Sequence, residues 1–210
     1  MATASSPELT IVGRSTSHFT RVTRIFAAEA RLESAFQVVP DLRLFAQADY
    51  AGNPALKVPI LRAPGGEWFG SLNICRELWR RSAQQLRVVW PEDLEQPVLA
   101  NAQELVLQAM STEVTLLMSR FFGERDGAHA AKLLQSLTNS VEWLERHVDG
   151  VLARLPENRD LSYLELTLYC LVRHLPFREA LSTEPYARLN EFCRAYETRP
   201  AVKDTPYRVD

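Results

Sequence analysis

The sequence predicts a mixed α/β domain followed by an all-helical domain, and the distribution of glycine and proline carries this prediction. Five of the eight glycines fall within the first 70 residues, whereas residues 98–155 contain no proline. A segment rich in glycine and proline is typical of short strands and helices joined by turns, and a long stretch without proline is typical of long helices. We expect an α/β domain over residues 1–83, a linker over 84–93 and a helical domain over 94–210.

Composition and charge limit the class of protein. Of the 210 residues 46% are hydrophobic, and 24 Lys+Arg against 26 Asp+Glu give a net charge of −2. Such a chain can bury a core, and its balanced charge argues against a nucleic-acid or membrane-surface partner. No apolar run approaches the ~18 residues of a spanning helix. The first eight residues lack the features of an export signal, so we expect a cytoplasmic protein.

The cysteines predict neither a disulfide nor a metal site. Cys75, Cys170 and Cys193 are odd in number, far apart and outside any CxxC pair. Three histidines of the helical half show no ligand spacing either. We expect buried, free cysteines and no bound metal.

The first elements are a strand, a helix and a second strand. An apolar run at residues 9–12 ends at Gly13, and residues 20–31 follow with apolar side chains at helical spacing. Ser17 or Thr20 is available to cap this helix. Residues 36–39 form the second strand, which the helical crossover makes parallel to the first.

A hairpin and a helix complete the α/β domain. Residues 58–61 are a strand candidate, and Gly65 and Gly66 form a turn before a partner strand at 67–69. These two strands are antiparallel. Ser71 is expected to cap the helix that follows.

Apolar stripes predict two long helices in the second half. One spans residues 98–121, with its stripe from Val98 to Leu116, and Gly123 and Gly127 then interrupt the chain. The second stripe starts at Leu134 and runs at the same spacing to Leu155, where Pro156 ends it.

Two further helices follow. Ser162 and Glu165 have capping-box spacing at the start of a helix over 161–175. A final helix over 184–196 stops before Pro200.

Five segments, in this order, resemble the glutathione transferases. The segment from Ser17 to Glu29 resembles the start of the family's first helix. The others resemble its N-P-x-x-x-V-P segment with a cis proline, its E-S-x-x-I motif, its capping box and its C-terminal ending. They are residues 53–59, 70–74, 162–165 and 197–205.

The resemblance implies a thioredoxin-like domain that binds glutathione, a helical domain that lines a site for an apolar electrophile, and a homodimer. Ser17 matches the serine that donates a hydrogen bond to the glutathione thiolate. A hydroxyl and a helix N-terminus both favour that negative charge and lower the pKa of the thiol. Ser15 and Thr16 in the same loop are alternatives for this role, and Ser17 is otherwise an ordinary N-cap.

The same resemblance assigns glutathione contacts. It implies that the backbone of Val58, before a cis Pro59, pairs with the cysteinyl part of glutathione. It places the γ-glutamyl carboxylate at Ser71 and the glycyl carboxylate near Lys57. Alternatively, Pro59 only starts an edge strand, Ser71 only caps its helix and Lys57 is a solvated surface residue.

The sequence departs from the family at three places. Gly70 stands where the family has an acid that meets the glutamyl ammonium group, His18 replaces a proline and Thr23 replaces a valine. Residues 14–19 contain no cysteine, which argues against the thiol-exchange members of the superfamily.

The electrophile pocket is expected between the loop after the first strand and the C-terminal part of helix 98–121. Alternatively, apolar residues at helical spacing belong to the hydrophobic core. The candidates are His18, Phe19, Met110, Val114 and Phe121.

We therefore expect a detoxifying enzyme that conjugates glutathione to small apolar electrophiles. The alternatives are a glutathione-dependent peroxidase or isomerase, and a non-catalytic adaptor of the same fold that resembles the stringent-starvation regulators. Gly70 and the missing Ser-Pro dipeptide favour the adaptor, whereas Ser17, Val58–Pro59 and Ser71 favour the enzyme.

Overall fold

The computed structural model describes residues 8–41, 43–123 and 127–210. The first seven residues, which belong to the segment expected to lack an export signal, lie outside the described residues. The chain divides into two compact units. The first contains the described residues up to Leu86 together with Arg199–Asp210, and the second is Arg87–Thr198.

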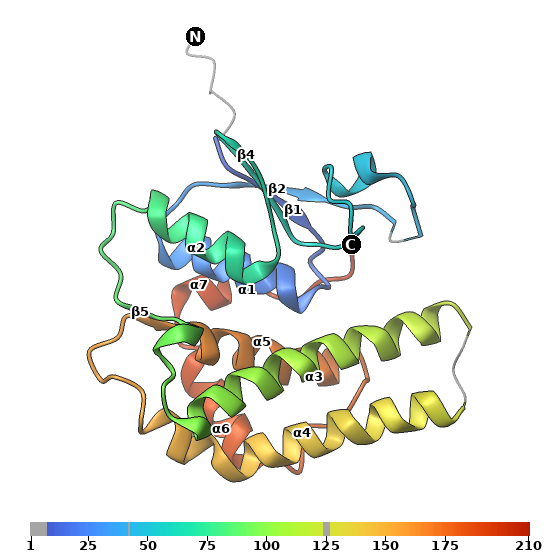
Figure 1. Cartoon of the computed structure of the whole chain (residues 1–210), viewed down its shortest axis with the longest axis vertical. Coiled ribbons are helices and arrows are strands. Elements are labelled where there is room, and N and C mark those ends of the chain that lie inside the picture. The colour runs from blue at the N-terminus through green and yellow to red at the C-terminus, as the bar shows by residue number, and fades with distance from the viewer. Residues whose placement is uncertain (1–7, 42, 124–126) are drawn as a thin grey trace. The chain divides into compact units, whose positions relative to one another are not determined.

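A four-stranded mixed sheet forms the centre of the first unit (Figure 1). Its strand order is β2-β1-β3-β4. β1 pairs parallel with β2, and β3 pairs antiparallel with both β1 and β4, which confirms the predicted directions. The strands are β1 (Thr10–Gly13), β2 (Ala35–Val38), β3 (Ile60–Ala63) and β4 (Gly66–Phe69).

Two helices, α1 (His18–Glu29) and α2 (Ser71–Arg81), pack against each other and against this sheet. The apolar spacing predicted for α1 is confirmed, because Val22, Ile25 and Phe26 are fully buried. Ser17 is the N-cap of α1, and its Oγ accepts from the Thr20 N–H at 3.2 Å.

The prediction that Ser71 caps α2 is wrong. Gly70 is the N-cap, and Ser71 is the first residue of the helix. Gly70 has a φ of +81°, a conformation that glycine adopts without the strain that a Cβ brings. A serine before a helix and a serine opening it differ by one residue, which spacing alone does not resolve.

The start of α1 lies so close to β1 that Gly13 has no room for a side chain. A Cβ built on Gly13 falls 2.5 Å from both Cγ2 and Oγ1 of Thr20. Thr20 is itself buried, and its Oγ1 accepts from the Arg14 N–H at 3.4 Å. The contact between Gly13 and Thr20 therefore fixes where the chain leaves β1 for the loop at residues 14–17.

In the second unit, α3 (Pro97–Phe121) and α4 (Ala128–Leu152) run side by side (Figure 1). On α4 the predicted stripe from Leu137 to Val151 is buried, whereas Leu134 is 38% exposed. On α3 the buried face is shifted from the predicted stripe, because Leu99 and Val106 are buried whereas Val98 and Leu105 are only half-buried. A helix with apolar side chains on more than one stripe does not reveal from spacing alone which stripe faces the core.

The remaining helices are α5 (Tyr163–Phe177), α6 (Ala187–Tyr196) and the short α7 (Pro200–Lys203). Ser162 is the N-cap of α5 and accepts from the Glu165 N–H at 3.5 Å. The Glu165 carboxylate binds the Arg159 guanidinium through two contacts of 2.7 Å. Ser162 therefore makes the hydrogen bond predicted for the serine of the capping box, and the Glu165 side chain forms an ion pair with Arg159.

The stretch predicted as a linker contains ordered elements. Val88–Val89 (β5) pairs in parallel with Leu161–Ser162 (β6), and the 3-10 helix η2 follows at Pro91–Asp93. Arg87 strengthens this pairing through its ion pair with Asp160 at 3.1 Å. A two-residue strand whose partner is far along the chain leaves no periodic signal.

The expected helical domain also differs from the structure at its end. Residues Arg199–Asp210 belong to the first unit, where Arg199 Nε binds Glu29 Oε1 at 2.7 Å. Arg21 Nη2 donates to the Val202 carbonyl at 3.4 Å. These contacts join residues that are 170 and 181 positions apart in the sequence, and local patterns do not report them.

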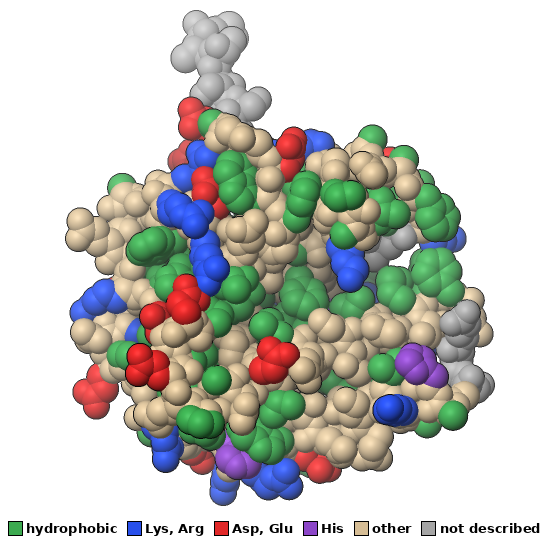
Figure 2. Space-filling model, in the orientation of Figure 1, with side chains coloured by type: hydrophobic (Ala, Val, Ile, Leu, Met, Phe, Trp, Pro, Cys, Tyr) green, Lys and Arg blue, Asp and Glu red, His purple; other side chains and the backbone are tan. Residues whose placement is uncertain are grey.

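The cysteines and the surface match their expected character. Cys75, Cys170 and Cys193 are free and buried, as predicted. No helix among the described residues has the length and apolarity needed to cross a bilayer. On the face drawn in Figure 2, basic and acidic side chains lie interspersed with apolar ones.

We expect Gly13→Ala to destabilise the first unit by about 1–3 kcal/mol, because a methyl group at 2.5 Å from the Thr20 side chain forces one element to move. Chemical denaturation measures the change. A double variant, Gly13→Ala with Thr20→Ala, removes the two closest atoms and is expected to lose less than the two single changes added together. An unchanged denaturation midpoint in Gly13→Ala would contradict the close packing.

Candidate functional site

Four loops of the first unit meet at one edge of the sheet because of the directions of its strands. Gly13 pairs with Val38 in the parallel ladder, so β1 and β2 both end at this edge. Ile60 pairs with Val12 and with Phe69, so β3 begins and β4 ends there too. The residues that follow β1, β2 and β4, and those that precede β3, are therefore neighbours.

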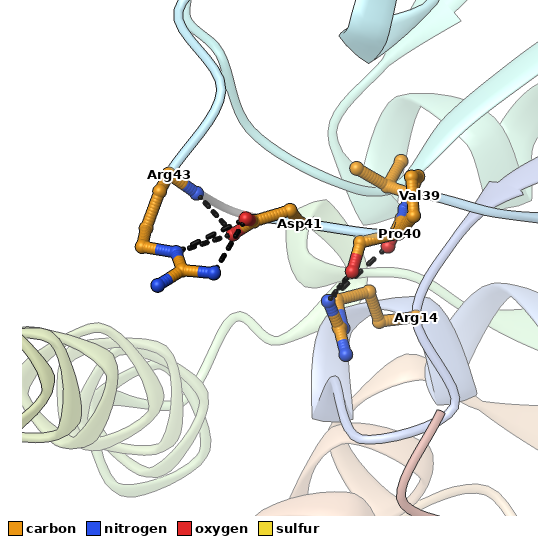
Figure 3. Close-up of polar contacts among 5 residues, drawn as sticks. All are labelled: Arg14, Val39, Pro40, Asp41 and Arg43. Carbon is orange, nitrogen blue, oxygen red and sulfur yellow. Dashed lines mark hydrogen bonds and ion pairs between the residues drawn. The ribbon is translucent and has the colours of Figure 1, made fainter.

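The loop after β1 carries Ser17 and is a tight turn. The Ser17 N–H donates to the Arg14 carbonyl at 3.1 Å, which closes the turn just before α1. Arg14 Nη1 also donates to the carbonyls of Val39 and Pro40, at 3.2 and 3.0 Å, so one guanidinium joins the loops after β1 and β2 (Figure 3).

The Ser17 hydroxyl is oriented at the N-terminus of α1. Its oxygen accepts from the Thr20 N–H, which leaves the hydroxyl hydrogen as the donor toward a ligand. The first turn of α1 contains no acidic residue, so the positive end of the helix dipole is not neutralised there. This arrangement favours an anion beside Ser17.

An exposed ion pair follows β2 at the same edge. The Arg43 guanidinium binds both carboxylate oxygens of Asp41, with Nη2 to Oδ2 at 2.8 Å (Figure 3). These hydrogen bonds hold the pKa of Asp41 below its usual value and raise the pKa of Arg43. Asp41 therefore remains a carboxylate at neutral pH.

The chain enters β3 through a cis peptide bond between Val58 and Pro59, as the resemblance implies. Asn53 shapes the approach: its Oδ1 accepts from the Ala55 N–H at 3.0 Å, and its Nδ2 donates to the Lys57 carbonyl at 2.7 Å. Val58 is half-buried and Lys57 is exposed. The backbone before the cis bond is thus held rigidly while the lysine side chain reaches solvent.

The N-terminus of α2 forms the fourth part of the site. Gly70 and Ser71 open this helix, and its first turn contains no acidic residue. A Cβ at Gly70 would have no atom within 4 Å, so the space beside this backbone is open. Backbone N–H groups of the first helical turn have no intrahelical acceptor and bind carboxylates readily.

The predicted pocket residues lie on two elements. His18 is buried at the start of α1, with its ring edge-on to Phe19 at a centroid distance of 4.6 Å. On α3, Met110 is fully buried, Val114 is half-buried and Phe121 is 54% exposed. Met110 has the burial of a core side chain, and Phe121 that of a surface side chain.

Sequence reasoning missed Arg14 and the Asp41–Arg43 pair. Their only signal was position, since each follows a predicted strand whose end faces the candidate site. A guanidinium that binds backbone carbonyls leaves no motif, because any residue supplies a carbonyl. These residues lie close together because the first two strands run parallel and both end at the same edge of the sheet.

The fold is similar to solved structures of glutathione S-transferases. One from Methylobacillus flagellatus, with glutathione bound, has a TM-score of 0.74 and 21% identity, and the match covers 94% of this chain and 98% of that one. A glutathione transferase family member from Pseudomonas fluorescens, with bound glutathione, has a TM-score of 0.75 and 18% identity over 96% and 100% of the two chains.

A theta-class glutathione S-transferase from Xanthomonas axonopodis pv. citri, with glutathione bound, has a TM-score of 0.67 and 24% identity, covering 97% of this chain and 99% of that one. Neither a protein-family model nor a curated protein sequence matches the chain. The likeness therefore rests on structure, and it shows that this chain has the fold of the glutathione S-transferases: a thioredoxin-like α/β part with a helical part.

Proposed function

We propose that the protein is a glutathione transferase that binds glutathione at the loop edge of the first unit. The observation that carries the proposal is the meeting, at that edge, of the N-termini of α1 and α2 with the cis Val58–Pro59 bond. Two helix N-termini suit a ligand with two negative groups, a thiolate and a carboxylate. Proteins of the same fold have been crystallised with glutathione bound.

Each part of glutathione has a proposed partner. Ser71 and the N–H groups of α2 bind the γ-glutamyl carboxylate, and the backbone of Val58 pairs with the cysteinyl residue as an added strand. Lys57, exposed beside this backbone, binds the glycyl carboxylate. Gly70 supplies no acid for the glutamyl ammonium group, so we expect weaker binding than a site with that acid would give.

The chemical step is attack by the glutathione sulfur. The Ser17 hydroxyl donates to the thiolate, and the N–H groups of α1 favour the same charge, so the thiol pKa falls below its usual ~8.5. The thiolate then forms a carbon–sulfur bond with the electrophile. The displaced group leaves with the electron pair, and the thiol proton has already passed to solvent.

The pocket for the electrophile and the assembly belong to the same proposal. His18, Phe19, Met110, Val114 and Phe121 are its proposed lining, which suits a small apolar molecule. We further propose a homodimer that acts in the cytoplasm in detoxification.

Two kinds of alternative function use the same fold. A peroxidase or isomerase would use the same stabilised thiolate on a different acceptor. A non-catalytic adaptor is favoured by Gly70, because this position lacks an acidic side chain. Titration with glutathione separates the adaptor from the enzymes, because only the enzymes require glutathione binding.

We expect Ser17→Ala to lower kcat for the conjugation of a chloronitrobenzene by about 10²-fold, since one donor to the reacting charge is lost. The dissociation constant for glutathione, measured by calorimetry, is expected to change little. Ser15→Ala and Thr16→Val are the matched controls from the same loop. Loss of turnover in one of these controls, with Ser17→Ala unaffected, would transfer the role to that residue.

The pH dependence gives a second prediction for the same residue. In the wild type with saturating glutathione, kcat/KM for the electrophile rises with pH as the bound thiol loses its proton, with an apparent pKa below ~8.5. In Ser17→Ala the thiolate loses its donor, so we expect that pKa to rise and the activity to recover in part at high pH. A pH–rate profile that is identical in the two proteins would contradict a role for Ser17 in stabilising the thiolate.

Ser71→Ala tests binding. A hydrogen bond to a charged carboxylate is lost, so we expect the affinity for glutathione to fall by about 10-fold or more. Ser111→Ala, an exposed serine of α3, is the matched control and is expected to bind normally. If the wild type binds no glutathione at millimolar concentration, the proposed function is wrong and the adaptor is favoured.

A further inference from the structure

The segment Arg199–Asp210 follows α1 from its C-terminal end to the loop before it. Arg199 binds Glu29, the last residue of α1, at 2.7 Å. Further along, Arg21 donates to the Val202 carbonyl at 3.4 Å, and its guanidinium carbon lies 4.3 Å from the centre of the Tyr207 ring. Helix α7, in this segment, packs against α1 (Figure 1).

The segment ends on the backbone of the loop that carries Ser17. The Ser15 N–H donates to Asp210 Oδ2 at 2.7 Å, a short distance typical of a hydrogen bond to a charged acceptor. Arg14 Nε lies 3.6 Å from the same oxygen. Both side chains of this ion pair are largely buried, with 15% of Arg14 and 10% of Asp210 exposed, although Asp210 as a whole residue is exposed.

The charges around Asp210 support this contact. Arg24, on α1, has its pKa lowered by burial and by the charges of Arg208 and Arg21, while Asp210 acts in the opposite direction. The positive charge of Arg14 also acts on Asp41, in the loop after β2, and contributes to lowering its pKa. The Asp210 carboxylate thus acts on Arg24 of α1 as well as on Arg14 of the loop.

We propose that Asp210 is a positioning residue for the loop at residues 14–17, and that it acts through the Ser15 amide. This inference rests on the proposed role of Ser17. Ser15 and Ser17 are two residues apart in one closed turn, so a shift at the Ser15 amide also displaces the Ser17 hydroxyl. A displacement of ~1 Å costs a reaction up to about 10²-fold in rate.

The test compares Asp210→Ala with Asp210→Asn. The alanine removes the acceptor, so we expect kcat to fall about 10-fold, with KM for glutathione within about 2-fold of wild type. The asparagine keeps an oxygen that accepts from the Ser15 N–H, and most of the rate is expected to return. Asp204→Ala, an exposed acid of the same segment, is the control and is expected to behave as wild type.

A second readout does not require glutathione. Amide hydrogen exchange at residues 15–17 is expected to speed up in Asp210→Ala and to stay at the wild-type rate in Asp210→Asn. If the wild type has no turnover, the proposed function fails, and the exchange rates still decide whether Asp210 holds the loop.

Two results would overturn the inference. Higher activity in both Asp210 variants would mean that the carboxylate obstructs the site. A lower thermal midpoint in Asp210→Ala, with kcat and the exchange of the loop unchanged, would mean that the contact only adds stability.

Discussion

The candidate site depends on the pairing of β1 with a parallel neighbour on one side and an antiparallel neighbour on the other. The parallel pair places the ends of β1 and β2 together, and the antiparallel ladder turns the start of β3 and the end of β4 to the same edge. Four segments that are separate in the sequence thereby become neighbours at this edge. A shift of one residue in this register would turn every strand side chain to the opposite face of the sheet.

The backbone contributes positive charge at that edge. Helices α1 and α2 both begin there, and neither carries an acid in its first turn. Helix N-termini supply fixed partial positive charge without a titratable group, so this part of the field is independent of pH. The charge of Arg14 is paired with Asp210, and its Nη1 donates to two carbonyls after β2, which also fixes the shape of the edge.

Much of the fold could be predicted from the sequence because it is encoded locally. Alternating turns and apolar runs indicated the strands of the sheet, and Ser17, which caps α1, was one of the two cap residues that the sequence offered. Two of the differences between prediction and structure come from contact between distant residues. Arg87 meets Asp160 within the stretch predicted as a linker, and Arg199 meets Glu29 although their predicted domains differ.

The residues of the candidate site also divide into those that a local pattern reveals and those that it does not. Ser17, Val58–Pro59 and Ser71 lie in motifs, and the register brings them to one edge. Arg14 and Asp210 lie in none, since each acts on backbone groups that every residue carries. A sequence pattern identifies the side chain that meets a ligand more readily than the one that holds a neighbouring amide in place.

The return of the segment Arg199–Asp210 to the first unit has a consequence for the order of folding during synthesis. The sheet, α1 and α2 leave the ribosome before the second unit, but the segment that contacts α1 is translated only after the whole second unit. The first unit therefore makes its contacts with this segment only after the second unit has been translated. A fragment that stops at Leu86 would represent this nascent intermediate, with the arginines of α1 and its preceding loop still lacking the contacts of the C-terminal segment.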